Sequence, residues 1–365
     1  MLVANTINLS NQQVFAQYQK ANQQILDVRT AVEWSHGIAQ GAHCISLVDI
    51  QTQNQSKLAK LDKNTTYFVM CQTGQRSQIA IAQLQQLGFN KLFHAFEGYK
   101  KWQEQGLPTE IPNLDTSSVR YSRHHQLHGF GEKAQEKLTK SSILLIGAGG
   151  LGSPAALYLA AAGVGTITLI DDDIVSLSNL QRQVIHTTES IGELKVESAK
   201  RQLTALNPEI TIQIIAEKIN PDNAQALIAK ADVAIDGSDN LATRYLVNDI
   251  CCQLNKPLVY AAVFQYEAQI TSFDFRQQNS PCLRCLFPQT AGFEPENCST
   301  VGVLGVVPAI AGIMQASEAI KLMTDVGETL QNKLQIIDLF DNSFRSIKYK
   351  KDTNCQHCFQ NSNQD

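Results

Sequence analysis

Residues 143–154 have the sequence ILLIGAGGLGSP, in which a short apolar run leads directly into a glycine-rich turn of the form GxGxxG. An Ala-rich stretch follows and stops at Gly163, so we expect a helix with Ser153 at its N-cap and Pro154 in its first turn. Glycines let the backbone approach phosphates, and a helix N-terminus supplies N–H donors. The stretch therefore predicts a nucleotide-binding turn, the alternative being a tight turn that binds nothing. Its glycines are Gly147, Gly149, Gly150 and Gly152.

The chain after residue 120 repeats this alternation of strand and helix. Expected strands cover residues 143–146, 166–170, 211–215, 233–235 and 258–263. Their Val and Ile residues continue without polar alternation, which favours strands buried on both faces of a parallel sheet. The pattern predicts an α/β fold of the Rossmann type, with a mixed, mainly parallel sheet.

Charged residues beyond the second strand distinguish between nucleotides. Asp171 ends that strand at the spacing of a ribose-binding acid. Arg182 follows in a polar segment, Lys195 lies in a helix expected to begin near residues 190–192, and Asp239 follows another strand. Cations and a metal-binding carboxylate suit a triphosphate, so the set favours ATP over NAD. Any one of them alone would be interpreted as a surface charge.

Composition excludes several classes of protein. The chain has 365 residues, 43% hydrophobic and 18% charged, which is enough for two to three folded domains. Its net charge of −4 argues against a main role in binding nucleic acid or an anionic membrane. We find no signal peptide or membrane span, because the apolar stretch 301–314 is short and interrupted. Nine cysteines without an export signal favour a reducing, cytoplasmic location.

The N-terminal region forms a pattern of its own. Apolar runs at 24–28 and 67–70 alternate with a helical stretch at 77–87, which predicts a small α/β domain. Residues 107–118, LPTEIPNLDTSS, have two prolines and no apolar periodicity, as in a linker. We therefore expect a domain at 1–108, a linker at 109–119 and a larger domain at 120–365.

The larger region resembles the MoeB/ThiF family, bacterial relatives of ubiquitin-activating enzymes that adenylylate sulfur-carrier proteins. The resemblance rests on RYSR at 120–123, GAGGLGSP at 147–154, LSNLQRQ at 177–183, GELKVESA at 192–199 and SDN at 238–240. It implies the Rossmann-like fold of ubiquitin-activating enzymes. It also implies ATP and Mg²⁺ as cofactors and, as partner, a ubiquitin-like sulfur carrier that ends in Gly-Gly.

The same resemblance implies roles for individual residues. Asp239 matches the magnesium-linked aspartate, and Arg123 matches an arginine that reaches the active site of the neighbouring subunit, which implies a homodimer. Asn179, Arg182 and Lys195 match residues that handle the phosphates. The expected nucleotide-binding set is Gly147, Gly149, Gly150, Gly152, Asp171, Ser178, Asn179, Arg182, Lys195, Asp239 and Asn240.

Two CxxC pairs indicate a metal site. Cys282 and Cys285 form one pair and Cys355 and Cys358 the other, and two such pairs complete a tetrahedral set of four thiolates. The MoeB/ThiF family carries structural zinc at matching positions. Disulfides are the alternative, and a reducing compartment disfavours them. We expect zinc to hold the C-terminal end of the chain in place, with His357 a bystander.

Cys71 begins the loop CQTGQRS at 71–77, between an apolar run and a helix. A cysteine at a helix N-terminus with Arg76 nearby is expected to exist largely as thiolate. The loop, with LDVR at 26–29 and FEGYKKW at 96–102, resembles rhodanese-like sulfurtransferases over residues 1–108. This resemblance implies a persulfide on Cys71, loaded by a donor such as a cysteine desulfurase. An inert domain used only for docking is the alternative.

Cys298 matches a loop cysteine over the active site of the MoeB/ThiF family, where some members form an acyl–sulfur link, and a chemical role here is left open. We expect Cys44, Cys251 and Cys252 to be packing residues.

Together these features predict adenylylation of a carrier's C-terminal glycine, followed by sulfur transfer from Cys71 that yields a thiocarboxylate. The sequence leaves open whether the carrier serves molybdopterin synthesis, thiamine synthesis or tRNA thiolation. A nicotinamide-dependent oxidoreductase is the alternative from another functional class. That function would not explain the positive charge of the LSNLQRQ segment.

Overall fold

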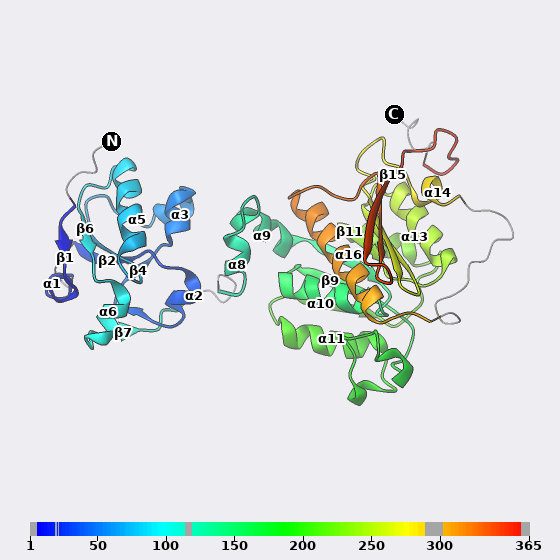
Figure 1. The fold of residues 1–365 in the computed structure, drawn as a ribbon, viewed down its shortest axis with the longest axis horizontal. Coiled ribbons are helices and arrows are strands. Elements are labelled where there is room, and N and C mark those ends of the chain that lie inside the picture. Colours follow the sequence, from blue (N-terminus) through cyan, green and yellow to red (C-terminus); the bar gives the residue numbers. More distant parts are fainter. Residues whose placement is uncertain (1–5, 19, 21, 114–118, 289–301, 359–365) are drawn as a thin grey trace. The chain divides into compact units, whose positions relative to one another are not determined.

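The computed structural model describes the whole chain except residues 1–5, 19, 21, 114–118, 289–301 and 359–365 (Figure 1). It divides into two compact units, Met1–Gln126 and Leu127–Asp365, and each is described by itself. The division falls a few residues after the expected linker.

The smaller unit is built on a five-stranded parallel sheet in the order β1-β6-β5-β2-β4. Successive residues of the central strand β5 face opposite sides, because side chains alternate along a strand. Tyr67 and Val69 pack toward helices α3 and α5, while Phe68 and Met70 pack with Trp102 of α6. The strands are β1 (Asn8–Leu9), β2 (Gln23–Asp27), β4 (His43–Cys44), β5 (Thr66–Met70) and β6 (Leu92–Ala95), with the separate pair β3 (Ile38–Ala39) and β7 (Thr109–Glu110). The helices are α1 (Asn11–Phe15), α2 (Ala31–Trp34), α3 (Leu47–Gln51), α4 (Gln55–Leu58), α5 (Gln75–Gln86), α6 (Gly98–Glu104) and α8 (Ser122–His125).

The larger unit is built on an eight-stranded mixed sheet in the order β10-β9-β8-β11-β12-β13-β14-β15. Its first five strands are parallel and the last three are antiparallel, which confirms the mixed, mainly parallel sheet expected from the sequence. The strands are β8 (Ser142–Ile146), β9 (Thr166–Ile170), β10 (Thr211–Ile215), β11 (Val233–Asp236), β12 (Leu258–Phe264), β13 (Glu267–Phe273), β14 (Lys333–Asp338) and β15 (Ser343–Lys348).

Helices cover both faces of this sheet. Leu145 of β8 packs in a core with α10, α11 and α16, whereas Leu144 packs in a second core with α12 and α13. The helices are α9 (Gly131–Lys140), α10 (Gly152–Ala162), α11 (Lys195–Leu206), α12 (Ala224–Ala229), α13 (Leu241–Gln253), α14 (Leu283–Leu286) and α16 (Val306–Thr324), with 3-10 turns η1 (Leu177–Asn179) and η2 (Thr188–Ser190).

Strand register brings the predicted nucleotide-binding segments to one edge of the sheet. Ile146 at the end of β8 pairs with Ile170 of β9 and with Asp236 of β11. Parallel strands that end level place their following loops together, and ligands of open α/β sheets bind at that edge. The glycine turn, Asp171 and residues 237–240 therefore share it.

Two expected helix starts are wrong. Helix α10 begins at Gly152 with Leu151 as its N-cap, and the Ser153 hydroxyl instead donates to the Ala148 carbonyl oxygen at 3.2 Å. Helix α11 begins at Lys195 rather than near 190–192. Residues 188–190 form the separate 3-10 turn η2, and Leu194, directly before the helix, is held in a bridge with Ile174.

Helix α16 is long and apolar enough to cross a membrane by composition alone. More than half of that segment is buried, where it contacts α10, β12 and β13. A core helix passes the same test, and the packing of α16 against α10 and the sheet explains its apolar length.

Candidate functional site

A cavity of about 400 Å³ opens at the carboxyl edge of the larger sheet. Most of the expected nucleotide-binding residues line it. They are Gly147, Gly149, Gly150, Asp171, Asn179, Arg182, Lys195, Asp239 and Asn240. Gly152 and Ser178 are not among the lining residues.

The glycines of the turn differ in whether the protein's own packing requires them. Gly147 has φ +91°, and an added Cβ would come within 3.0 Å of the Gly237 carbonyl oxygen. At Gly152 an added Cβ would collide with the carbonyl oxygen of Gly147. Gly149 meets nothing closer than the Gln183 side chain at 3.7 Å, so the protein's own packing does not require a glycine there. A ligand approaching the backbone would require it.

Asp171 ties the glycine turn to the segment that follows β9. Its Oδ2 accepts the Ala148 N–H at 2.7 Å and its Oδ1 accepts the Asp173 N–H at 2.9 Å. Burial raises the pKa of Asp171, while the nearby Lys195 ammonium opposes that rise. The carboxylate is therefore fixed in place with lone pairs left to accept a ribose hydroxyl.

Lys195 is held at the cavity by Asp173. Its ammonium lies 2.8 Å from Asp173 Oδ2, and its backbone N–H donates to the Asp173 carbonyl at 2.9 Å. The lysine side chain is 7% exposed, whereas that of Asp173 is 68% exposed. Sequence reasoning missed Asp173 as this partner, although it lies only two residues beyond Asp171.

Other predicted residues form hydrogen bonds within the protein that shape the cavity wall. Arg182 Nη1 donates to the Ser178 carbonyl at 3.1 Å, and Asn179 Oδ1 accepts the Ser176 N–H at 3.1 Å. Asn240 is the N-cap of α13, with Oδ1 accepting the Thr243 N–H at 2.9 Å. The amide of Asn240 thus shapes the loop that carries Asp239.

Two buried charged residues that the sequence did not reveal, Asp236 and Arg244, hold Ser238, the residue before Asp239. Asp236 is fully buried, and its Oδ1 accepts both the N–H and the hydroxyl of Ser238. Burial raises the pKa of Asp236, and the Arg244 guanidinium opposes that rise. Arg244 lines the cavity and donates to the Ser238 carbonyl at 2.9 Å. The only sequence signal was an arginine four residues after the helix-capping Asn240.

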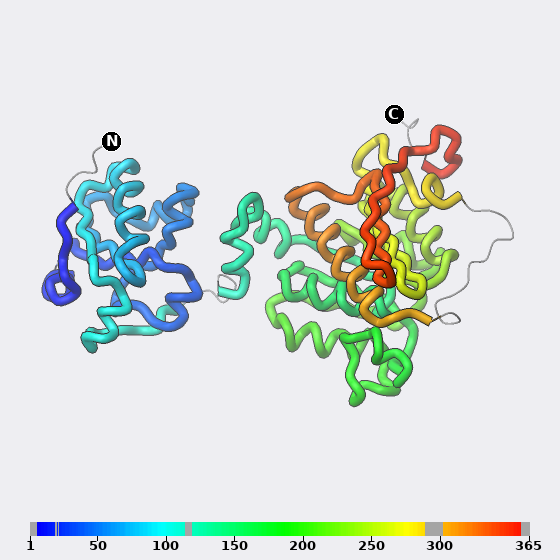
Figure 2. The backbone as a smooth tube through the Cα atoms, viewed as in Figure 1, coloured from blue at the N-terminus to red at the C-terminus, as the bar shows by residue number. Residues whose placement is uncertain are grey.

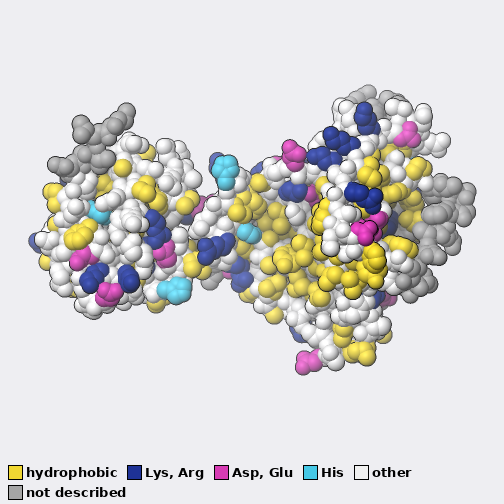
Figure 3. Space-filling model, in the orientation of Figure 1, with side chains coloured by type: hydrophobic (Ala, Val, Ile, Leu, Met, Phe, Trp, Pro, Cys, Tyr) yellow, Lys and Arg dark blue, Asp and Glu magenta, His cyan; other side chains and the backbone are white. Residues whose placement is uncertain are grey.

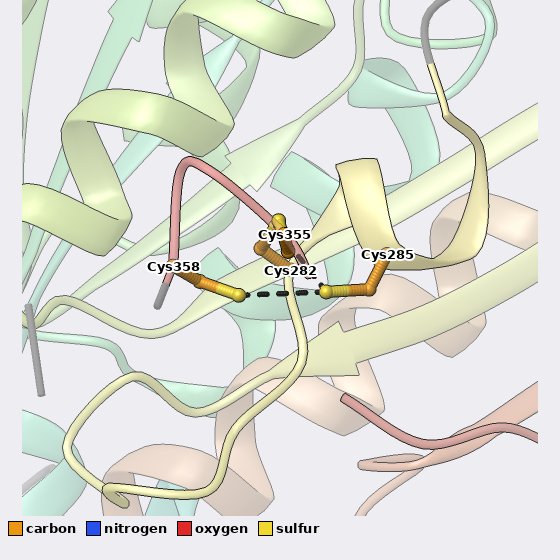
Figure 4. A group of neighbouring side chains, drawn as sticks. All are labelled: Cys282, Cys285, Cys355 and Cys358. Atoms are coloured by element: carbon orange, nitrogen blue, oxygen red, sulfur yellow. Dashed lines mark hydrogen bonds between the residues drawn. The ribbon is translucent and has the colours of Figure 1, made fainter. Parts of the chain in front are cut away.

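The four predicted metal ligands come together from two distant segments (Figure 4). Cys282 lies 3.8 Å from Cys285 and 3.7 Å from Cys355, and Cys285 lies 3.4 Å from Cys358, all between sulfurs. Four thiolates at about 2.3 Å from a zinc ion would lie about 3.8 Å apart, so the donor set fits a tetrahedral metal site. Figure 2 shows the two segments, in yellow and red, meeting at one end of the larger unit.

Cys71 follows β5 and faces the start of α5, as expected for the CQTGQRS loop. It is 1% exposed, and the Ser77 hydroxyl donates to its sulfur at 3.5 Å. Arg76, expected to act on this cysteine, is engaged elsewhere, since its two terminal nitrogens lie 2.7 and 2.5 Å from the Glu33 carboxylate. Burial opposes the shift, but hydrogen bonds from Arg76 and Thr30 lower the pKa of Glu33 to about 2.

Two predicted residues, Arg123 and Cys298, belong to none of the groups described above. Arg123 lies exposed on α8 and does not line the cavity. Cys298 lies outside the described residues. Of the expected packing cysteines, Cys251 and Cys252 are buried and Cys44 is half-buried.

Comparison with protein families gives two matches. The model of the ThiF family matches residues 121–357, and that of the rhodanese-like domain matches residues 10–105.

Individual relatives cover about two thirds of the chain. A sulfur carrier protein adenylyltransferase of Thermus thermophilus is 39% identical over 244 residues, 66% of this chain and 90% of that protein. The adenylyltransferase and sulfurtransferase MOCS3-1 of Zea mays is 45% identical over 245 residues, 67% of this chain, and the match spans about half (52%) of that protein. The crystal structure of E. coli MccB with AMPCPP and MccA has a TM-score of 0.59 and 27% identity, covering 68% of this chain and 76% of that one.

Proposed function

Because this chain belongs to the ThiF family and carries a rhodanese-like domain, we propose that it adenylylates a sulfur-carrier protein and then transfers sulfur to it. One observation carries the proposal: a single chain contains both a cavity with Lys195, Arg182 and Asp239 and an intact CQTGQRS loop with Cys71. The chain is thus an adenylyltransferase of the sulfur-carrier type with a sulfurtransferase domain. The Thermus relative is named a sulfur carrier protein adenylyltransferase, and the maize relative an adenylyltransferase and sulfurtransferase.

In the first reaction the carrier's C-terminal carboxylate attacks the α-phosphate of ATP, and pyrophosphate leaves. Both reactants are anions, so their approach requires fixed positive charge and no side-chain nucleophile. Lys195 and Arg182 supply that charge at the cavity, and Asp171 orients the ribose. Asp239 would hold Mg²⁺, which when bound offsets phosphate charge.

In the second reaction Cys71 carries the sulfur. Its thiolate attacks the outer sulfur of a donor persulfide, the donor's S–S bond breaks and the donor leaves as a thiol. The Cys71 persulfide then attacks the acyl-adenylate carbonyl and expels AMP, forming an acyl disulfide. A second thiol cleaves that disulfide, which releases the thiocarboxylate and leaves this thiol disulfide-bonded to Cys71. Cys298 is a candidate for this thiol.

Carrier-dependent ATP–pyrophosphate exchange tests the first reaction. Lys195→Met removes a cation that the cavity uses, so we expect exchange to fall about 100-fold or more. Lys200→Met is the matched control, because Lys200 is exposed on the same helix. Full exchange in Lys195→Met, or in Asp239→Ala, would contradict the assigned site.

Thiocarboxylate formation, read by mass spectrometry of the carrier, tests the second reaction. Cys71→Ala should abolish it while leaving exchange unchanged. If Cys71→Ala still yields thiocarboxylate, the smaller unit serves only for docking, which is the alternative function. Pull-down of the carrier would decide among molybdopterin synthesis, thiamine synthesis and tRNA thiolation.

The proposal extends to assembly and location. We propose a cytoplasmic homodimer with structural zinc at the four cysteines and a cysteine desulfurase as sulfur donor. Figure 3 shows hydrophobic side chains gathered over the larger unit, and the segment after β9 exposes Ile174, Leu177 and Val184, with Leu177 70% exposed. A second copy covering this segment would explain that exposure.

A further inference from the structure

His94 is a buried histidine of the smaller unit that neither proposed reaction uses. It lies on β6, next to β5 in the sheet, and is 3% exposed. Its Nε2 lies 2.9 Å from the Gly74 carbonyl oxygen and 3.0 Å from the Ser77 hydroxyl. Its Nδ1 lies 2.9 Å from Oδ1 of the Asn8 side-chain amide. The ring therefore connects the surface of the unit to the loop that carries Cys71.

The Ser77 hydroxyl has a choice of acceptors. Its oxygen lies 2.8 Å from the Gly74 carbonyl oxygen and 3.5 Å from the Cys71 sulfur. The carbonyl is the nearer acceptor, and a hydroxyl has one proton to donate. Something must direct that proton to the sulfur if Ser77 is to stabilise negative charge there.

We propose that His94 is a positioning residue for sulfur transfer, which directs the Ser77 hydroxyl toward the sulfur of Cys71. Its Nε2–H donates to the Gly74 carbonyl and to the Ser77 oxygen, and Ser77 donates its own proton to Cys71. The Gly74 carbonyl oxygen can only accept, which identifies Nε2 as an N–H donor. A neutral ring then requires the Asn8 amide to be turned over, so that its NH₂ group rather than Oδ1 faces Nδ1. Burial lowers the pKa of His94, which keeps the ring neutral. Donors in series strengthen one another in a buried network.

The hydrogen bond acts when sulfur is passed on. In thiosulfate:cyanide transfer, cyanide attacks the outer sulfur of the Cys71 persulfide, the S–S bond breaks, thiocyanate forms and Cys71 leaves as a thiolate. A hydroxyl donating to that sulfur stabilises the leaving group more than the persulfide, so it affects kcat more than KM. This inference rests on the proposed sulfurtransferase function.

A double-mutant cycle in the full chain tests the series of hydrogen bonds from His94 through Ser77 to Cys71. Thiosulfate:cyanide transfer should lose about tenfold in kcat in His94→Ala and in Ser77→Ala, with KM for thiosulfate unchanged. The double variant should lose no more than Ser77→Ala alone, because His94 acts through Ser77. His94→Gln restores an N–H donor and should recover most of the rate. His43→Ala, an exposed histidine on β4 of the same unit, is the matched control and should be unaffected.

Two further measurements distinguish a variant that does not fold from a result that contradicts the proposed role of His94. Both tryptophans, Trp34 and Trp102, lie in this unit, so their fluorescence reports its folding in the full chain. The rate of Cys71 alkylation by iodoacetamide, followed on its tryptic peptide, measures the thiolate without any transfer activity. If the parent chain transfers no sulfur, the proposed sulfurtransferase function is wrong. The alkylation rates of the variants still test whether His94 and Ser77 act on the Cys71 sulfur. Losses that multiply in the double variant, or a folded His94→Ala chain with full rates, would overturn the inference.

Discussion

At the scale of single residues, the sequence predicted charged groups that line one cavity, but not the residues that hold them in place. Arg182 and Lys195, which follow β9, and Asp239, which follows β11, line one cavity. Asp173 and Arg244, which fix Lys195 and the Ser238 loop, were missed. Such partners are set by side-chain direction across neighbouring loops, and residue type in one sequence does not report it.

The Glu33–Arg76 ion pair gives a prediction for the dependence of stability on pH. Because the folded pKa of Glu33 lies near 2, below the ordinary 4.5, its stabilisation is complete above about pH 4.5 and is lost as the pH falls toward 2. Glu33→Gln should lower the free energy of unfolding of the smaller unit by about 1 kcal/mol at pH 6, a value reduced by solvent screening of the half-buried pair.

Urea unfolding followed by tryptophan fluorescence measures this effect. The curves of the parent chain and Glu33→Gln should separate at pH 6 and converge progressively between pH 4.5 and pH 3. A separation that stays constant over this range would show that the charge on Glu33 is not the cause.

At the scale of elements, the strands were predictable and the helix starts were not. The apolar runs at 166–170 and 211–215 match β9 and β10 residue for residue. Only β9 has no exposed residue on either face; β10 is the edge strand and exposes Thr211 and Gln213, so the expected burial on both faces is wrong there. The start of α11 was placed too early because Ser190 and Gly192 look like a helix boundary. The bridge from Ile174 to Leu194 overrides that local signal, and only tertiary structure contains it.

Substitutions in the glycine turn distinguish a glycine that a bound ligand requires from one that backbone packing requires. Gly149→Ala meets only ordinary contacts, so the chain should keep its melting temperature while KM for ATP rises about tenfold. Gly152→Ala collides with backbone and should lower the melting temperature by several degrees or prevent folding.

Thermal melting and carrier-dependent exchange kinetics provide the two measurements. Equal destabilisation by both substitutions would show that Gly149 serves packing after all. An unchanged KM in Gly149→Ala would place the phosphates away from this turn.

At the scale of the whole molecule, the sequence correctly predicted two α/β regions and a four-cysteine cluster. The cluster was predictable because CxxC pairs are local patterns, and two of them suffice for a tetrahedral site. The segments they join are 70 residues apart, between Cys285 and Cys355, and their meeting is a consequence of the antiparallel strands β13, β14 and β15.

The zinc content of the purified chain tests the proposed metal site. The purified chain should contain one zinc ion, and Cys358→Ser should lose it and lower the melting temperature of the larger unit by several degrees. ATP–pyrophosphate exchange at low temperature should persist, since the cysteines do not line the cavity.

His357→Ala is the control for this experiment, because His357 is exposed between two ligands and belongs to no ligand group among the described residues. It should retain both metal and melting temperature. Retention of zinc in Cys358→Ser, or its loss in His357→Ala, would require a different ligand set.

The path of the chain between the two cysteine pairs has a mechanical consequence. Helix α16 lies on that path and supports the nucleotide edge, where Gln315 Nε2 donates to the Asp236 carbonyl at 2.6 Å and Pro308 lines the cavity. If zinc binds the four cysteines as proposed, force applied to the chain beyond Cys358, from an unfoldase or an optical tweezer, would reach the metal–sulfur bonds before it reaches this helix. As long as those bonds held, α16 would keep its place in the wall of the nucleotide cavity.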